Sequence, residues 1–299
     1  MQLRSYDRRS VVFLVLGTLL FGWVLFGWWQ KDYMNPDKVF KDMLSYSMNT
    51  YGYTKIIEQK NESQDTLEKT QAFYGPFNGV YAIASITQKK NNAVTGRVVT
   101  ETIGNASQES VRYVEISSDL KKPDGSPVDF NGLVGVWARN DVAAGPNAFL
   151  ATKYGLVPFG LLTPSQRQEM LDFISKKDVY SYKVLEDAPD TDKNTFVYKV
   201  KINQKAQVEM IKKYAELTGD KSLDSINPDD YANGKDIEAQ FYIKKNSRQL
   251  TKIRFVSFGV AEEYAGYGIQ KNLPVPEAKI STQELQKQLS DKAATAKRE

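Results

Sequence analysis

The sequence of 299 residues contains no cysteine and no histidine. Without cysteine, the chain can form no disulfide bond, no thiolate zinc site and no iron–sulfur cluster, and it cannot carry a lipid on a cysteine. Without histidine, it has no Ser–His or Cys–His nucleophile pair and no imidazole metal ligand. Most common hydrolase and metalloenzyme sites are thereby excluded, and we expect no metal ion and no cofactor.

The chain also lacks a large excess of charge of either sign. Its 40 Lys and Arg residues and 36 Asp and Glu residues give a net charge of +4. Residues 1–31 contribute +3 of this, which leaves 36 basic and 35 acidic residues in the remainder. A mixed surface of this kind does not predict nucleic-acid binding. The 41% of hydrophobic residues is typical of a globular protein with one large or two small domains.

One long apolar run lies near the N-terminus. Residues 11–29, VVFLVLGTLLFGWVLFGWW, are 19 residues without a charge, enough for a helix to span a hydrocarbon core of about 30 Å. Arg4, Arg8 and Arg9 precede the run. The positive-inside rule therefore places residues 1–10 in the cytoplasm and the rest of the chain outside.

A cleaved signal peptide is the alternative interpretation of this run. Its apolar region would be shorter, and small residues would mark the cleavage site, whereas this run ends in Trp-Trp-Gln-Lys. We therefore predict an uncleaved signal anchor and a single-pass protein of the cell membrane. Residues 32–272 are expected to form an extracytoplasmic domain, and residues 273–299 an exposed C-terminal helix or tail.

The outer domain combines helix and strand patterns. Asn35-Pro36 starts a predicted helix, and Thr163-Pro164-Ser165-Gln166 and Asn203 start two more. Ser281-x-x-Glu284 is a further capping box, for the C-terminal helix. Alternating, β-branched runs predict strands over residues 51–59, 66–74, 80–87, 94–103, 111–117, 179–186, 195–202, 237–244, 249–258 and 260–269. The predicted fold is α+β: a large, curved antiparallel sheet, half-barrel-like, packed on two or three helices and preceded by one transmembrane helix.

Two stretches carry a family resemblance. Residues 196–202, FVYKVKI, form a strand that runs directly into a helix, and residues 241–253, FYIKKNSRQLTKI, form a hairpin. With the helix over residues 37–49 leading into a meander, they resemble the lipoprotein-carrier and lipid-binding half-barrel superfamily of bacterial cell envelopes. The resemblance covers about half of the chain and implies a curved sheet whose concave side holds acyl chains. The overall plan is similar to single-pass envelope proteins of small-genome bacteria.

The most apolar stretch outside the anchor is residues 154–162, YGLVPFGLL. Proline and glycine within it argue against a regular central strand. It is either a lip over an apolar cavity or a buried piece of the core, and the sequence leaves both open. The candidate ligand-binding residues of this lip are Tyr154, Leu156, Val157, Phe159, Leu161 and Leu162.

Carboxylate chemistry is the remaining route to catalysis. Glu262-Glu263 are neighbours on a predicted strand, so their side chains point to opposite faces and cannot act as a pair. Asp229-Asp230 follow a proline and are typical of a helix start or an Asx turn. The acidic stretch at residues 187–194 lacks the glycine and glutamate of an EF-hand loop. We therefore predict no catalytic residue and no enzymatic activity.

The leading hypothesis is a membrane-anchored extracytoplasmic binding protein whose ligand is a lipid or lipoprotein acyl chain. It predicts a lined cavity of several hundred Å3 between sheet and helices. The alternative is a structural or assembly subunit of the cell envelope that docks a protein partner. A histidine-free hydrolase, with two facing carboxylates in a cleft, is the third possibility.

Overall fold

The computed structural model describes residues 21, 23–24, 27, 29–75, 78–91, 93–140, 148–186, 188, 192–257 and 259–296. Its helices are the π-helical turn η1 (Trp29–Tyr33), α2 (Pro36–Ser47), the 3-10 turn η2 (Asn131–Leu133), α3 (Ala148–Lys153), α4 (Pro164–Lys176), α5 (Gln204–Leu217), the 3-10 turn η4 (Pro228–Tyr231) and α6 (Thr282–Ala294). Its strands are β1 (Gly52–Lys60), β2 (Gln64–Phe73), β3 (Gly79–Lys90), β4 (Ala93–Gly104), β5 (Glu109–Ser118), β6 (Ala138–Asn140), β7 (Tyr180–Val184), β8 (Thr195–Ile202), β9 (Ile237–Lys244), β10 (Leu250–Phe255), β11 (Ala261–Ala265) and β12 (Ile280–Ser281).

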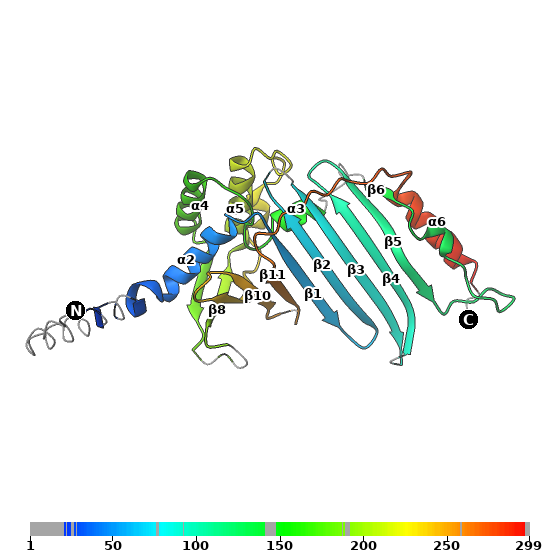
Figure 1. Ribbon diagram of the computed structural model, residues 1–299, viewed down its shortest axis with the longest axis horizontal. Coiled ribbons are helices and arrows are strands. Elements are labelled where there is room, and N and C mark those ends of the chain that lie inside the picture. The colour runs from blue at the N-terminus through cyan, green and yellow to red at the C-terminus, as the bar shows by residue number, and fades with distance from the viewer. Residues whose placement is uncertain are drawn as a thin grey trace, which may run out of the picture.

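In the described part of the chain, twelve strands form one open sheet in the order β12-β6-β5-β4-β3-β2-β1-β11-β10-β9-β8-β7. Neighbouring strands are antiparallel except for the short parallel pair of β12 and β6. Strand β1 joins two halves, because it pairs with β2 on one side and with the much later β11 on the other. Figure 1 shows the long strands β1–β5 side by side and α2, α4 and α5 gathered at the other half. The predicted α+β class and large antiparallel sheet are confirmed.

The meander β1–β5 forms where the alternation predicted it, and two of its turns use the same chemical device. The Asn61 Oδ1 accepts hydrogen bonds from the backbone N–H groups two and three residues later, at 3.0 and 2.7 Å. In the β4–β5 turn, Asn105 makes the same pair of bonds, both at 2.9 Å. These Asx turns satisfy backbone groups at the point of reversal and thereby help to fix the strand register.

The three helices of the main core start at the predicted caps. The Asn35 side chain accepts from the first turn of α2, and Asn203 accepts from the first turn of α5. Thr163 and Gln166 form a reciprocal capping box at the start of α4. Each cap supplies an acceptor for N–H groups that have no partner inside the helix.

The main core lies between these helices and one face of the sheet. Phe40 of α2 is 1% exposed, and its ring stacks on that of Tyr182 with 4.0 Å between centroids. The Tyr198 ring approaches Phe40 edge-on at 5.3 Å. Burying one such aromatic side chain contributes about 1.5–3 kcal/mol, so this contact fixes α2 over β7 and β8.

A segment without regular structure, residues 266–279, connects β11 to β12 across the ends of the intervening strands; we call it the strap. Its first part contacts β1, where the Gly268 N–H donates to the Gly52 carbonyl at 2.9 Å. Further along, the Pro276 carbonyl accepts from Ser110 Oγ on β5 at 2.8 Å. Figure 1 shows the strap running along the ends of β1–β5 toward α6.

The C-terminal segment differs from the expectation of an exposed helix or tail. Ser281 caps α6 as predicted, accepting from the Glu284 N–H at 3.1 Å. However, Leu285 is 3% exposed and belongs to a second, small core. The other buried members of this core are Phe130, Leu133 and Ala138. The few apolar residues of α6 suffice because Leu285 and Leu289, four residues apart, lie on the same side of the helix.

Most of the predicted membrane anchor, residues 11–29, lies outside the described residues. Among the described residues, no helix is both long enough and apolar enough to cross a membrane. The residues that follow the predicted anchor are held to the domain by Arg248, whose guanidinium lies 4.3 Å from the centre of the Tyr33 ring. Arg248 also donates to the Tyr33 carbonyl at 2.6 Å and to Asp42 at 3.2 Å. These contacts fix η1 and α2 against the turn between β9 and β10.

The strap's path over β1 can be tested at Gly52. A Cβ at this position would lie 2.3 Å from the Ile269 carbonyl oxygen and 2.6 Å from that of Ala72. Because both are backbone atoms, we expect Gly52→Ala to lower the free energy of unfolding by about 1–3 kcal/mol, measured by urea denaturation of the full chain. In Gly132→Ala, where nothing lies within 4 Å of the new Cβ, the change should stay within about 0.5 kcal/mol. Equal stability of Gly52→Ala and wild type would rule out this contact.

Candidate functional site

The lip segment, residues 154–162, connects α3 to α4 and packs against the main core. Three of its six predicted ligand-binding residues are buried: Val157 (1% exposed), Phe159 (2%) and Leu162 (3%). Tyr154 and Leu156 are half-buried, and Leu161 is exposed (37%). The segment therefore combines the two alternatives that the sequence left open, a lip beside a cavity and a buried piece of the core. Part of it fills the core, and part of it borders two cavities.

Tyrosine hydroxyls hold the backbone of the lip segment. Tyr180 Oη on β7 donates to the Leu156 carbonyl at 2.6 Å, and Tyr214 Oη on α5 donates to the Phe159 carbonyl at 2.7 Å. Buried carbonyl groups need partners, and an irregular segment cannot supply them from its own backbone. The two hydroxyls therefore make burial of this segment possible.

The far end of the lip segment is tied to the end of α2. The Thr50 N–H donates to the Gly160 carbonyl at 2.8 Å, and the Gly160 N–H donates to the Ser47 carbonyl at 3.1 Å. The Leu162 N–H donates to the Met48 carbonyl at 2.9 Å. The segment is thus held along its length by hydrogen bonds to α2, α5 and the sheet.

A cavity of about 290 Å3 lies between the lip segment, α5 and the sheet; we call it the lip cavity. It is lined by Tyr53, Lys55, Ala151, Thr152, Tyr154, Gly155, Leu156, Val157, Phe159, Gln207, Ile211, Phe255, Glu262 and Tyr264. Four of the six predicted lip residues are among them. The Phe159 ring stacks on Tyr53 at 4.1 Å and on Tyr264 at 5.6 Å, so aromatic faces form much of one wall.

The sheet side of the lip cavity carries one charged pair. Lys55 Nζ on β1 lies 3.8 Å from a carboxylate oxygen of Glu262 on β11, and their side chains are 16% and 18% exposed. Tyr264 donates a short hydrogen bond to the other carboxylate oxygen. Burial and the neighbouring Glu262 carboxylate raise the pKa of Tyr264 well above its ordinary value. The phenol therefore stays protonated and remains a donor.

A second cavity, of about 660 Å3, borders the other end of the lip segment at Leu161 and Leu162. Between the two cavities lies a charged cluster. Lys153 Nζ is 3.2 Å from Asp220 Oδ2, and the Tyr154 hydroxyl donates a short hydrogen bond to the same oxygen. The Lys153 ammonium also lies over the Tyr154 ring, 5.0 Å from its centre. This cluster fastens the start of the lip segment to the loop that follows α5.

Burial and the contacts within the charged cluster act in opposite directions on the pKa of Asp220, and also on that of Lys153. Burial by itself would raise the pKa of Asp220, but hydrogen bonds from Tyr154 and Ser222 and the charge of Lys153 hold it well below its ordinary value. Burial lowers the pKa of Lys153, and Asp220 opposes that change. The folded state therefore favours the ionised carboxylate.

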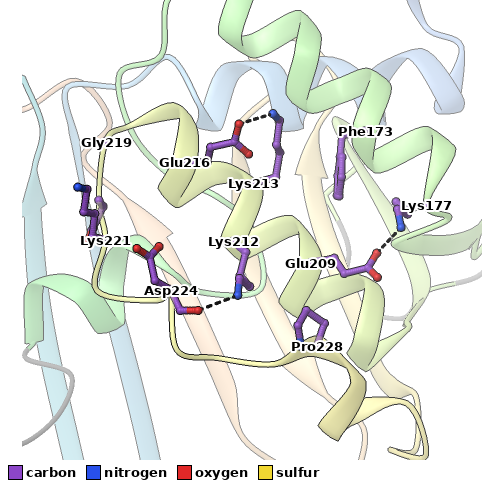
Figure 2. Close-up of a pocket in the computed structure, with 11 residues that line it drawn as sticks. Phe173, Lys177, Glu209, Lys212, Lys213, Glu216, Gly219, Lys221, Asp224 and Pro228 are labelled. Carbon is purple, nitrogen blue, oxygen red and sulfur yellow. Dashed lines mark hydrogen bonds and ion pairs between the residues drawn. The ribbon is translucent and has the colours of Figure 1, made fainter.

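A more open groove of about 580 Å3 lies between α4, α5 and the loop after α5 (Figure 2). Its charged side chains largely pair with one another. Lys177 lies 2.7 Å from Glu209, and Lys213 lies 3.1 Å from Glu216. Figure 2 shows these pairs along the groove. Because both signs alternate and neutralise each other, the groove is typical of a solvated helix surface.

The acidic motifs adopt the arrangements expected of them. Glu262 faces the lip cavity, whereas Glu263 pairs with Lys252 at 3.3 Å. Asp229 and Asp230 lie in the 3-10 turn η4. In the described residues, no three His, Cys, Asp or Glu side chains are grouped as metal ligands.

Part of the acidic stretch at residues 187–194 lies outside the described residues, including Asp187 and Asp190. Within the described part, Asp192 pairs with Lys244 at 2.7 Å. This contact ties the β7–β8 connection to β9.

The sequence indicated the lip segment but not the side chains that surround it. Tyr53 and Tyr180 have the inward positions that strand alternation predicts, yet nothing local shows that their hydroxyls meet an irregular segment. Gln207 and Tyr214 lie on the buried side of α5. A polar residue on an otherwise apolar helix face was the available signal for Gln207.

The sequence matches no protein-family model and no curated protein. Among solved structures, the crystal structure of LprF from Mycobacterium bovis is similar at 10% sequence identity, over 81% of this chain and 97% of that one, with a TM-score of 0.40. A likeness at this TM-score carries no argument about the site. The expected relation to lipid-binding half-barrels therefore stays a prediction.

The charged cluster predicts a pH dependence. A carboxyl whose pKa is lowered in the folded state stabilises the protein above its unfolded pKa of about 3.9, and this contribution is lost as pH falls toward the folded pKa. We expect Asp220→Asn to be less stable than wild type by about 1–3 kcal/mol at neutral pH. The difference should shrink below about pH 4. Urea denaturation across this range would measure it.

A matched control is Asp236→Asn, which changes an exposed carboxyl away from the cluster. We expect its stability to follow that of wild type within about 0.5 kcal/mol. If the gap between wild type and Asp220→Asn were the same at every pH, the carboxylate would not be the form that the cluster stabilises.

Proposed function

We propose that this chain is a membrane-anchored, extracytoplasmic binding protein that holds the acyl chain of a lipid or lipoprotein and performs no catalysis. The observation that carries the proposal is the lip cavity, where predicted lip residues meet aliphatic and aromatic side chains of α5 and the sheet. Ligand sites are typically concave, mostly apolar and furnished with a few polar groups. The lip cavity has this composition, with Gln207 and the Lys55–Glu262 pair as its polar groups.

The size of the lip cavity favours one acyl chain over a whole diacyl lipid. Its volume of about 290 Å3 is near the lower end of the roughly 300–1,000 Å3 of small-molecule sites. Each methylene group buried there contributes about 0.8 kcal/mol. Roughly six methylene groups would supply about 5 kcal/mol, against which the entropic cost of binding must be set.

The proposed location places such ligands within reach. An anchor at residues 11–29, with Arg4, Arg8 and Arg9 on its cytoplasmic side, would hold the domain against the outer surface of the cell membrane. There, acyl chains are available from the bilayer itself. The proposal includes a distant relation to the half-barrel lipid carriers, with the lip segment at the entrance.

A groove at the end of the sheet supports the alternative, an assembly subunit that docks a protein partner. This groove of about 530 Å3 lies between α2, α4 and β7, and Leu44, Leu171 and Tyr182 help to line it. Strand β7 is the last in the sheet, so one side of its backbone faces no other strand of the described residues. Edge strands beside apolar grooves can accept a strand from a partner.

Site-resolved photo-crosslinking distinguishes these functions. The full chain would be reconstituted in nanodiscs that contain a fatty acid with a diazirine on its chain, and labelled peptides would be mapped by mass spectrometry. We expect labels within residues 151–159 and on the facing part of α5. Ile211→Trp, which fills the lip cavity from α5, should reduce this labelling several-fold because it occupies the ligand's volume.

The matched control is Leu171→Trp, which adds the same side chain in the groove between α2 and α4. It should leave labelling of residues 151–159 unchanged. Labels confined to the anchor, or insensitive to Ile211→Trp, would contradict the proposal. Labels along the α2–α4 groove, lost in Leu171→Trp, would shift the ligand to that groove.

A further inference from the structure

Strand β7 ends the sheet in the described part of the chain, so one of its edges has no neighbouring strand there. Toward β8, the Leu185 N–H donates at 2.8 Å and the Val179 carbonyl accepts at 3.2 Å. Because bonded positions alternate along two antiparallel strands, the odd-numbered residues of β7 direct their backbone groups to β8. The backbone N–H and carbonyl groups of the even-numbered residues, Tyr180, Tyr182 and Val184, therefore point to the free edge.

Two of these residues also line the groove between α2, α4 and β7. The groove has a volume of about 530 Å3, and Tyr180 and Tyr182 share its wall with Leu44 of α2 and Leu171 of α4. In an antiparallel strand added to β7, the residues that bond to Tyr180 and Tyr182 would place their side chains on this same face of the sheet. Every second side chain of the added strand would therefore meet the groove.

The other face of the sheet is basic beside this edge. Lys183 is exposed and lies opposite Lys199 of β8. Lys199 and Lys201 share one carboxylate, that of Glu238, at 3.3 and 3.4 Å. These three lysines and one glutamate leave the face with positive charge. The remaining side chains of an added strand would lie opposite Ser181 and Lys183, where a carboxylate is favoured over an ammonium group.

The edge is selective because of its length and its lysine. Strand β7 has five residues, and short edge strands with an outward lysine resist pairing with strands in general. The lysine opposes a basic strand but favours an acidic one. Pairing with β7 of a second copy would bring the basic faces of both copies side by side. Charge complementarity therefore favours an acidic partner over a second copy.

We propose that β7 is a docking edge for an extended segment of a protein partner, which adds to the sheet as an antiparallel strand with alternating apolar and acidic side chains. Its apolar side chains enter the groove between α2 and α4, and its carboxylates face Lys183. Main-chain hydrogen bonds supply affinity in such a complex, and the alternate side chains supply specificity. The groove and the lip cavity share no lining residue, so one chain can hold both an acyl chain and this partner.

The probe is a fluorescent peptide, Thr-Val-Glu-Val-Glu-Val-Thr, titrated with the full chain in nanodiscs of zwitterionic lipid and followed by anisotropy. We expect binding, and binding about tenfold weaker when lysines replace the glutamates. N-methylation of the valines removes the N–H groups that would donate to β7, and it should abolish binding. N-methylation of the glutamates, whose N–H groups would point away from β7, is the matched control and should leave most of it.

Charge reversal on the protein tests the acidic preference. Lys183→Glu should reverse the preference, so that the lysine peptide binds more tightly than the glutamate peptide. Lys69→Glu is the matched control, because Lys69 is exposed on β2 and the strand registers place it on the same face of the sheet as Lys183. It should keep the wild-type preference. Ile211→Trp, which fills the lip cavity, should leave peptide binding unchanged.

Each other outcome overturns the inference. Equal binding of the glutamate and lysine peptides to the wild-type protein would contradict the acidic partner. Binding that survives N-methylation of the valines, or no binding of any peptide, would contradict strand addition. A dimer of the wild-type chain in detergent that the peptide dissociates, measured by sedimentation, would assign the edge to a second copy. The wild-type comparisons decide the inference even if a variant does not fold, and they leave the acyl-chain proposal untouched.

Discussion

Burial of the lip segment depends on hydrogen-bond donors that it cannot provide for itself. A segment interrupted by proline and glycine leaves carbonyl groups without partners in its own backbone. Tyr180 of β7 and Tyr214 of α5 donate to two of these carbonyls, and Gln207 donates to a third and shares the one that Tyr180 contacts. Each bond requires its donor at one place, so the same bonds that permit burial also set the position of α5 over the sheet.

The lip cavity lies where the two halves of the sheet meet. Lys55 belongs to β1 and Glu262 to β11, and these strands pair although they are far apart in sequence. The charged pair thus crosses the seam between the halves. Aromatic rings from β1, β11 and the lip segment close the cavity beside that seam. The lip cavity therefore lies where two strands that are distant in sequence pair with each other.

The walls of the lip cavity make one demand on a ligand. The aliphatic and aromatic walls favour a hydrocarbon chain because its transfer from water is favourable. Among the polar groups of the lip cavity, Gln207 donates to the lip segment and Lys55 pairs with Glu262. The proposed acyl chain meets this demand.

The sequence by itself determined the features whose causes lie within a few residues. The caps Asn35, Thr163 and Asn203, the alternating strands of the meander and the apolar character of the lip segment are of this kind. Only the tertiary structure decided that β1 pairs with β11, that the strap carries α6 back to the sheet and that Gln207 of α5 donates to the lip segment. These depend on contacts between distant parts of the chain. Backbone propensity and capping act locally. The pairing of distant strands and the hydrogen bonding of buried polar groups depend instead on everything packed around them.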